Sequence, residues 1–399
     1  MPVELGGIGQ VLRTARERAG LTQEAAAEAA GLNRVVLSYY ETGDRQPSLA
    51  VLSGLARLYG LTLAGLLEGA DRQPEPTEVL FRAAPAELGD NARSGMAVFS
   101  SLVGAYVDLV EDIGGQSPGR GASPLPPARP TAGRREAARL AREAREVLGL
   151  GEGPVGDHLL TIVDEWALVF RLRLGESQDH SPSGFFYNHP RAGFCIVANS
   201  EMTFGRQVFT VAHELAHALF HSQSADVWIS FPGAPESRER FADLFAGELL
   251  VPEDALIGAV EDLGGADQLG DPIAAVHLQR HFGVSYATLL VRLRQQRLIS
   301  EQVYHDLREV SPSRLALALG YEVNPADLGD YRIHPLDRIP RRMLRLVSSA
   351  IAKGVMTRGD AAETLGVSTE EILQLLDRPR ADASEVLALE EIEGGARFS

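Results

Sequence analysis

The chain has 399 residues, which is enough for two or three domains of ordinary size. Its 45% hydrophobic and 23% charged residues are typical of globular proteins, so a mainly disordered, collagen-like or coiled-coil chain is excluded. The formal net charge of −16 excludes nucleic-acid binding through the overall field, and any contact with DNA must come from a local surface.

Residues 1–69 are predicted to form a small helical domain. Apolar residues at helical spacing are interrupted at Gly20, Gly31, Gly43 and Gly60. Thr22 and Asn33 stand where helix N-caps are expected. The pattern indicates about five short helices, and those predicted over 22–30 and 33–40 have helix-turn-helix spacing.

This segment, LRTARERAGLTQEAAAEAAGLNRVVLSYYETGDRQPSLAVLSGLARLYGLTLAGLL, resembles the Xre (phage repressor-like) helix-turn-helix family. The resemblance implies a double-stranded DNA operator as partner, with residues 33–40 as the recognition helix. It implies a phosphate contact from Gln23 and contacts in the groove from Asn33, Arg34, Val35 and Tyr39. Arg16 and Glu41 match the internal ion pair of the family.

A protein-interaction bundle is the alternative for this module. Over residues 1–67, six arginines are balanced by six acidic residues, so the module has no net charge. Because affinity for DNA depends largely on neutralising phosphates, a neutral module should bind weakly as a monomer. We therefore expect it to depend on homodimerisation.

Two less regular segments follow the helical module. Apolar periodicity predicts a helical connector over 78–114. Residues 115–135, GQSPGRGASPLPPARPTAGRR, are crowded with Pro, Gly and Ser. This composition predicts a semi-stiff, solvated linker.

Residues 136–262 are predicted to form a second globular domain. Apolar spacing favours helices over 140–148, 159–170, 208–220 and 241–251. The best strand candidate is 193–198, which is either an ordinary sheet strand or an edge strand able to pair with an extended substrate. The single cysteine, Cys195, lies in it, excludes an intramolecular disulfide and cysteine zinc sites, and is expected to be a buried small hydrophobe.

The most informative segment is His213-Glu214-Leu-Ala-His217, which lies within a stretch of apolar residues at helical spacing. Histidines four residues apart lie on one helix face, where two imidazoles can hold one divalent ion. Glu214 is then placed to act as general base. In a chain with 10 histidines, chance would produce this pattern roughly 0.02 times. We therefore predict a metal site.

Zinc that acts in catalysis needs a third protein ligand. Glu239 and Asp243 stand four residues apart on a second predicted helix, so Glu239 could ligate while Asp243 accepts a hydrogen bond from a ligating imidazole. Glu236 and Glu248 are weaker candidates and are expected to be solvated carboxylates.

The stretches RQVFTVAHELAHALFH and ERFADLFAGELLVP together resemble the ImmA/IrrE metallopeptidase family, over about residues 136–255. The resemblance implies a small, gluzincin-like α/β fold with one zinc ion bound by His213, His217 and Glu239, and Glu214 as catalytic base. Manganese or iron would also suit the two histidines and the carboxylate. Some family members cleave a repressor under stress, which suggests a substrate class.

Other features leave alternatives open. Tyr187, His189 and His221 are candidates for stabilising the oxyanion, although His221 could equally cap its helix or support a ligand. Residues 263–399 are predicted to be helical, with helix-turn-helix character near 273–299 and 357–376, and their role is open. His277 and His281 lack a glutamate between them and are expected to be packing or surface residues.

The sequence thus predicts a mainly α, multidomain protein that couples DNA binding to zinc-dependent proteolysis of a repressor or antitoxin. A transcription factor whose zinc domain is a non-proteolytic sensor is the alternative, and the antitoxin half of a toxin–antitoxin pair is a third possibility. No secretory signal or membrane-spanning run is apparent, so we expect a cytoplasmic protein.

Overall fold

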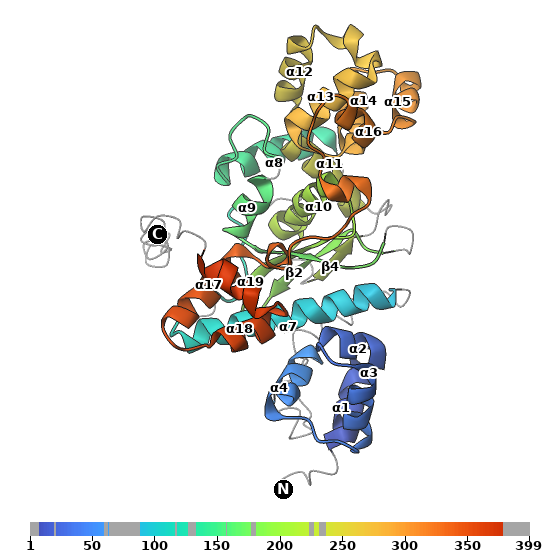
Figure 1. Cartoon of the computed structure of the whole chain (residues 1–399). Coiled ribbons are helices and arrows are strands. Elements are labelled where there is room, and N and C mark those ends of the chain that lie inside the picture. The colour runs from blue at the N-terminus through green and yellow to red at the C-terminus, as the bar shows by residue number, and fades with distance from the viewer. Residues whose placement is uncertain are drawn as a thin grey trace.

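The computed structural model describes residues 8–19, 21–59, 63, 88–115, 118–126, 133–156, 158–176, 181–222, 227–230 and 237–377. The helical module, a long crossing helix, an α/β domain and a further group of helices follow one another along an elongated molecule (Figure 1). The fifth predicted helix of the first module, Glu236 and residues 378–399 lie outside the described residues. No described helix is long and apolar enough to cross a membrane.

The first module contains four described helices around one apolar core. They are α1 (Ile8–Arg18), α2 (Gln23–Ala29), α3 (Arg34–Thr42) and α4 (Leu49–Leu58). The predicted caps are confirmed: the Thr22 side chain accepts a hydrogen bond from Ala25 N, and the Asn33 side chain accepts one from Val35 N. Gly43 ends α3 in the left-handed conformation, at φ 82°, which a glycine adopts without strain. The helix-turn-helix pair α2–α3 is therefore fixed by local chemistry.

Helix α7 (Asp90–Asp112) joins the first module to the α/β domain. Helices α2 and α4 pack on it, and its Phe99 ring meets Phe170 and Phe185 of the sheet edge-on, at 5.2 and 5.0 Å between centroids. Gly95 permits this close approach, because a Cβ atom there would lie 2.2 Å from the carbonyl oxygen of Arg173. The predicted connector is thus a helix buried on two faces.

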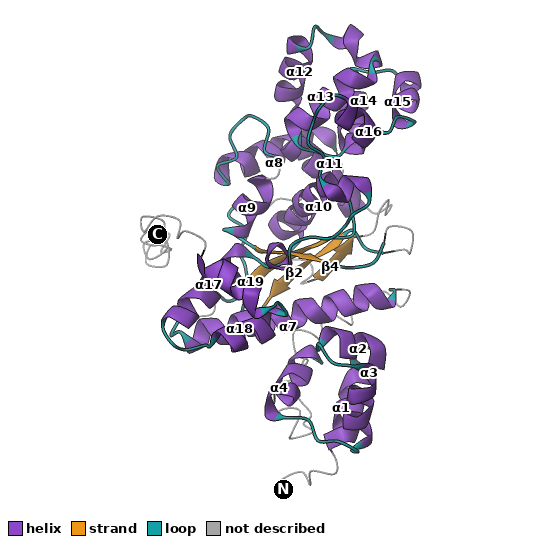
Figure 2. Cartoon of the chain, in the orientation of Figure 1, coloured by secondary structure: helices purple, strands orange, loops and turns teal. Residues whose placement is uncertain are grey.

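The α/β domain is built on a small mixed sheet (Figure 2). Its strands are β1 (Leu168–Leu172), β2 (Gly184–His189), β3 (Gly193–Asn199) and β4 (Val227–Ser230), in the order β1-β3-β2-β4. β1 runs parallel to β3, while β2 is antiparallel to both β3 and β4. Side chains alternate between faces, so Phe185 packs toward α7 and Phe186 toward the opposite core.

Two sequence predictions in this domain need correction. The helix expected over 159–170 ends at Asp164, and residues 168–172 form β1. The apolar run Leu-Val-Phe satisfies helical spacing and a doubly buried strand equally well. The strand expected at 193–198 is confirmed as β3, but it lies between β1 and β2 and is not an edge. The edge strand beside the predicted metal helix is β4.

The predicted linker is attached to the sheet where the structure describes it. Asn188 of β2 accepts a hydrogen bond from Gly121 N and donates one to Gly121 O. Gly121 lies against the ring of Phe194, and Leu125 is buried. Residues 118–126 are therefore docked on the β2–β3 hairpin instead of being wholly solvated.

Helices cover the sheet and extend the domain. The face opposite α7 carries α8 (Arg134–Val147), α9 (His158–Asp164), α10 (Phe204–Ala216) and α11 (Ser237–Leu250). Above them stand α12 (Glu253–Asp262), α13 (Pro272–Phe282), α14 (Tyr286–Gln295), α15 (Glu301–Arg308) and α16 (Pro312–Ala318). The chain returns to α7 through α17 (Arg341–Ala352), α18 (Arg358–Leu365) and α19 (Thr369–Asp377). The predicted mainly α, multidomain architecture is confirmed.

Candidate metal centre and nucleic-acid interface

Helix α10 and the π-helical turn that continues it, His217–His221, present two imidazoles to one point. α10 is packed between the sheet and α11, so His213, Glu214 and His217 are all buried. One helical turn separates the histidines, and their Nε2 atoms lie 3.2 Å apart. Two nitrogen ligand atoms are therefore aimed into the same space.

Helix α11 supplies a carboxylate to that space. Oε2 of Glu239 lies 3.2 Å from Nε2 of His213, and Oε1 lies 3.2 Å from Nε2 of His217. The three predicted ligands are brought together, with their ligand atoms within 4.8 Å of one another. Two imidazole nitrogens and a carboxylate are a donor set that suits zinc and other first-row divalent ions.

The remaining nitrogen of each imidazole is held by a neighbour. Oδ1 of Asp243 lies 2.9 Å from Nδ1 of His213, as the spacing of Glu239 and Asp243 predicts. Nδ1 of His221 lies 2.9 Å from Nδ1 of His217, and the ring of Trp228 stacks on His217 with centroids 5.2 Å apart. These contacts fix both rings so that Nε2 faces the site, which is how supporting groups orient metal ligands.

Glu214 is fully buried, and within the described residues neither of its carboxylate oxygens makes a hydrogen bond of ordinary geometry, although the Ser230 hydroxyl lies nearby. Burial raises the pKa of Glu214 to about 8, against the opposing effects of the His213 charge and the Ser230 hydroxyl. Nε2 of His221, Nε1 of Trp228 and Oγ of Ser230 are also buried without partners. Buried polar atoms without hydrogen bonds are rare in folded proteins. Their concentration around this triad is typical of a site that binds a cation, water and a polar substrate.

The protonation of the ligands depends on the same contacts. Burial lowers the pKa of His213, but hydrogen bonds with Asp243 and Glu239 outweigh it and raise the pKa to about 10. Burial raises the pKa of Glu239, yet hydrogen bonds from His213 and His217 bring it well below its usual range. The metal-free triad is therefore stabilised by a proton on His213, which a cation must displace.

Several other candidates lie elsewhere. Tyr187 and His189 belong to the opposite face of the sheet, where Tyr187 packs near Phe99, and His189 accepts hydrogen bonds from the backbone of the β2–β3 turn. Of the three oxyanion candidates, His221 alone contacts the triad. Cys195 is buried, as expected, and burial raises the pKa of its thiol.

The expectation of a solvated Glu248 is wrong. Its carboxylate oxygens lie 2.8 and 2.7 Å from the Nη atoms of Arg292, and both side chains are buried. This pair ties α11 to α14, so Glu248 is a structural residue. His277 is a packing residue, hydrogen-bonded to the Tyr321 hydroxyl.

Sequence reasoning missed Trp228 and Ser230, which β4 brings to the metal triad. The strand has four residues, and its Val-Trp-Ile-Ser sequence is too short to show an alternation of apolar and polar residues. β4 lies at the edge of the sheet, so only one of its sides is paired with another described strand.

The surface of α3 carries the residues implied as DNA contacts. Asn33 and Arg34 are exposed, and Val35 and Tyr39 are 54% and 47% exposed. Large apolar side chains on a helix that is not covered by its own module suit contacts with base edges. Helices α2 and α4 face α7, so α3 stays accessible.

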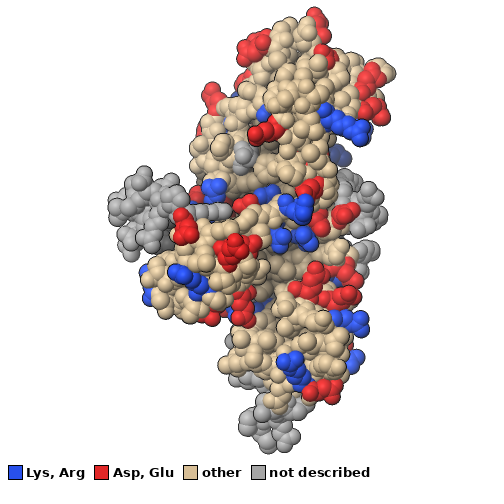
Figure 3. Space-filling model, in the orientation of Figure 1, with Lys and Arg blue, Asp and Glu red and all other residues tan. Residues whose placement is uncertain are grey.

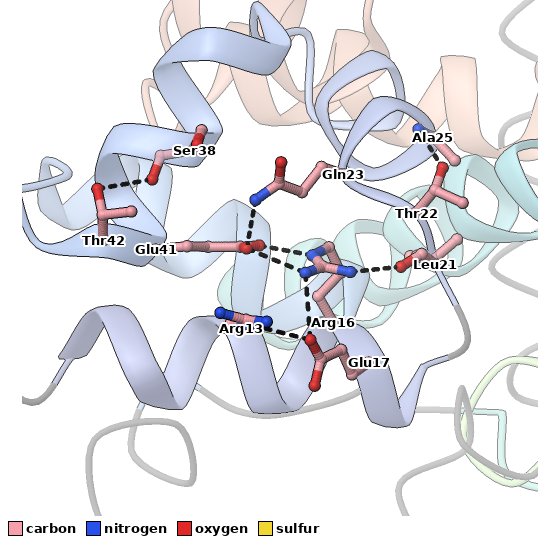
Figure 4. A network of polar contacts seen from close by, with 10 residues as sticks. All are labelled: Arg13, Arg16, Glu17, Leu21, Thr22, Gln23, Ala25, Ser38, Glu41 and Thr42. Atoms are coloured by element: carbon pink, nitrogen blue, oxygen red, sulfur yellow. Dashed lines mark hydrogen bonds and ion pairs between the residues drawn. The ribbon is translucent and has the colours of Figure 1, made fainter.

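Beneath this surface, one buried network holds the module together (Figure 4). Glu41 accepts hydrogen bonds from Nε and Nη2 of Arg16 at 2.6 and 3.0 Å, which confirms the predicted ion pair. Nε2 of Gln23 donates to Oε2 of Glu41 at 2.9 Å, so this side chain is engaged with the core of the module.

Fold and site together define a protein of two functional modules, a helix-turn-helix domain and an α/β domain whose buried His-Glu-x-x-His helix faces a carboxylate from the next helix. Comparison with known families agrees: residues 8–68 match a helix-turn-helix domain, and residues 168–294 match the IrrE N-terminal-like domain. The chain thus joins a helix-turn-helix domain to an IrrE-like domain.

Curated relatives match a limited part of the chain. The HTH-type transcriptional regulator PuuR of Escherichia coli (strain K12) and that of Shigella flexneri are each 30% identical to this chain over 86 residues. The match covers 22% of this chain and 46% of the relative, so this chain spans about half the length of these proteins.

Proposed function

We propose that this protein is a cytoplasmic, DNA-binding regulator whose IrrE-like domain is a zinc-dependent endopeptidase acting on another regulatory protein, a repressor or antitoxin. The observation that carries the proposal is Glu214, a buried carboxylate beside three converging ligands that makes no hydrogen bond of ordinary geometry in the described part of the chain. Burying an unpaired carboxylate is costly. A domain that only senses metal has no use for it, whereas hydrolysis requires a base at this position.

In the proposed reaction His213, His217 and Glu239 would hold the cation. Zinc in such a site lowers the pKa of water and polarises a peptide carbonyl. Glu214 removes the proton from the attacking water and delivers it to the departing amine nitrogen. The edge strand β4, which pairs with β2 on one side, is the element against which an extended substrate backbone would align.

The decisive experiment compares the zinc-loaded chain with its Glu214→Gln variant on purified candidate repressors and antitoxins. We expect cleavage by the wild type and loss of at least a hundredfold in rate in the variant, which keeps the metal ligands. Elemental analysis of the wild type and of His217→Ala tests the cation separately. Equal cleavage by both proteins, or none by the wild type, would leave the non-proteolytic sensor as the better description.

The DNA-binding half of the proposal is supported by the helix-turn-helix match and the exposed face of α3. Selection of binding sites from random duplexes, followed by footprinting, would define the operator. Arg34→Gln and Tyr39→Ala should weaken binding to the selected site about tenfold or more, whereas Arg13→Gln on α1 should not. The two-fold symmetry of the selected site would report whether a homodimer binds.

A further inference from the structure

A cleft of about 340 Å³ opens beside the metal triad and runs between three helices. α10 contributes Phe209 and His213, and α11 contributes Asp243 and Leu244. The third wall is the helix α14, with Thr288, Val291 and Gln295. Since His213 and Glu239 line the same cleft, any chain bound at the triad extends into this space.

Arg206 stands in the wall of this cleft and forms no ion pair with a described residue, although the charge of Asp243 acts on it. It precedes His213 by seven residues on α10, so both side chains lie on one face. Its side chain makes no hydrogen bond or ion pair within the part of the chain that the structure describes, although it is half-buried. An arginine keeps its charge in such surroundings, so its five N–H donors are open to an anion.

Two further arginines, Arg240 and Arg292, line the cleft, and they differ from Arg206 in their ion pairs and exposure. Arg292 is neutralised by Glu248 at 2.7 Å. Arg240 is exposed on the α11 side and has no ion pair among the described residues. The cleft therefore offers two cationic groups that form no ion pair with a described residue, Arg206 in the wall and Arg240 at the rim.

The net charge of the cleft with a bound dication is opposite in sign to the net charge of the whole chain. The charges of Glu239, Asp243 and the ionised Glu214 exceed those of a dication held by the triad by one, so Arg206 and Arg240 leave one net positive charge at the cleft. The whole chain, by contrast, carries −16, and acidic side chains are spread over the visible face of every lobe (Figure 3). A locally positive cleft in an acidic protein attracts acidic ligands and repels basic ones.

We propose that this cleft selects peptides with an aspartate or glutamate close to the scissile bond, and that Arg206 is the residue that recognises it. This inference rests on the proposed peptidase function. The apolar side chains of Phe209, Leu244 and Val291 beside the arginines suit the body of a peptide better than a small free anion. Arg206 begins roughly 10 Å from His213 along the helix axis, and an extended chain rises about 3.3 Å per residue, so the acidic side chain falls within about three residues of the cleaved bond.

The experiment uses the full-length, zinc-loaded protein and a pool of peptides made by digesting a bacterial proteome, with cleavage sites read by mass spectrometry. We expect Asp or Glu to be enriched at one position near the cut. A well-cleaved peptide is then synthesised with Glu and with Gln at that position, and kcat/KM is measured for both. A charge-assisted contact of this kind predicts a ten- to hundredfold preference for the Glu peptide.

Three variants complete the test. Arg206→Gln should bring the Glu/Gln ratio of kcat/KM close to one, and Arg206→Lys should restore part of the preference. Arg142→Gln, which removes an exposed arginine of α8 outside the cleft, should change neither value. Cleavage without an acidic preference, or a preference unchanged in Arg206→Gln, overturns the inference and leaves the peptidase function standing. Absence of any cleavage overturns both.

Discussion

Oδ1 of Asp243 lies 2.9 Å from Nδ1 of His213, although the Asp243 side chain is 56% exposed and the imidazole is buried. An exposed carboxylate thus fixes the tautomer of a buried ligand, because Nδ1 must carry the proton that it donates to Asp243. Asp243→Ala should weaken zinc binding about ten- to a hundredfold while the fold persists. Competition with a fluorescent chelator measures this. Asp254→Asn, which removes an exposed acidic charge of α12, is the matched control and should bind zinc like the wild type.

Zinc affinity should fall as the pH is lowered. In the metal-free chain the pKa of His213 is raised to about 10, so at neutral pH its imidazole carries a proton that the cation must expel. One proton released per bound ion gives a change of about tenfold in apparent affinity per pH unit between pH 6 and 9. Calorimetry in buffers of different ionisation enthalpy counts the released protons. An affinity that does not vary with pH would contradict this account of the triad.

Much of the site follows from sequence because helix periodicity is a strong constraint. Histidines four residues apart share one helix face, and the same rule puts Glu239 and Asp243 together on α11. What periodicity cannot supply is the arrangement of short strands. β1 lies in an apolar segment whose spacing also fits a helix, and β4, with four residues, is too short to show a pattern. Trp228, Ser230 and the position of β3 inside the sheet depend on strand pairing between distant segments, for which one sequence carries no signal.

The charged residues show the same limit. Glu248 resembles any surface glutamate in the sequence, because its partner Arg292 is 44 residues away and reaches it through the packing of α14 on α11. Arg16 and Glu41 are 25 residues apart, yet they could be paired because the module resembles a family with a known internal ion pair. Long-range contacts of polar residues are thus predictable by resemblance and not by local pattern.

The buried pair in the helix-turn-helix module should matter far more than a neighbouring exposed one. Glu41→Gln leaves the buried Arg16 guanidinium without its counter-ion, and we expect a cost of about 3–5 kcal/mol in the stability of the module. Arg13→Gln breaks the exposed pair with Glu17 four residues away and should cost about 0.5 kcal/mol or less. Hydrogen–deuterium exchange of α1–α4 in the full chain measures both. Equal protection in the two variants would contradict the prediction.

The stability of the α/β domain should depend on the ionisation of Asp164. This carboxylate accepts hydrogen bonds from Val169 N, at the start of β1, and from Arg341 N, at the start of α17. Burial raises its pKa to about 6 from an ordinary value of 3.8. Since the folded state holds this proton more tightly than the unfolded state, the contribution of Asp164 to the free energy of unfolding is highest below pH 4 and falls as the pH rises from 4 to 6. The change is on the order of 3 kcal/mol.

Asp164→Asn removes this titration and so provides the test. Relative to the variant, the wild type should lose stability by that amount between pH 4 and pH 7. Both tryptophans of the chain, Trp166 and Trp228, lie in the α/β domain, so their fluorescence during urea unfolding follows this domain. Glu165→Gln, which breaks an exposed ion pair with Arg345, should show no such pH-dependent difference. If Asp164→Asn and the wild type kept a constant difference in stability across this range, the carboxylate would titrate at its ordinary pKa, and the contact between α9 and α17 would not depend on its charge.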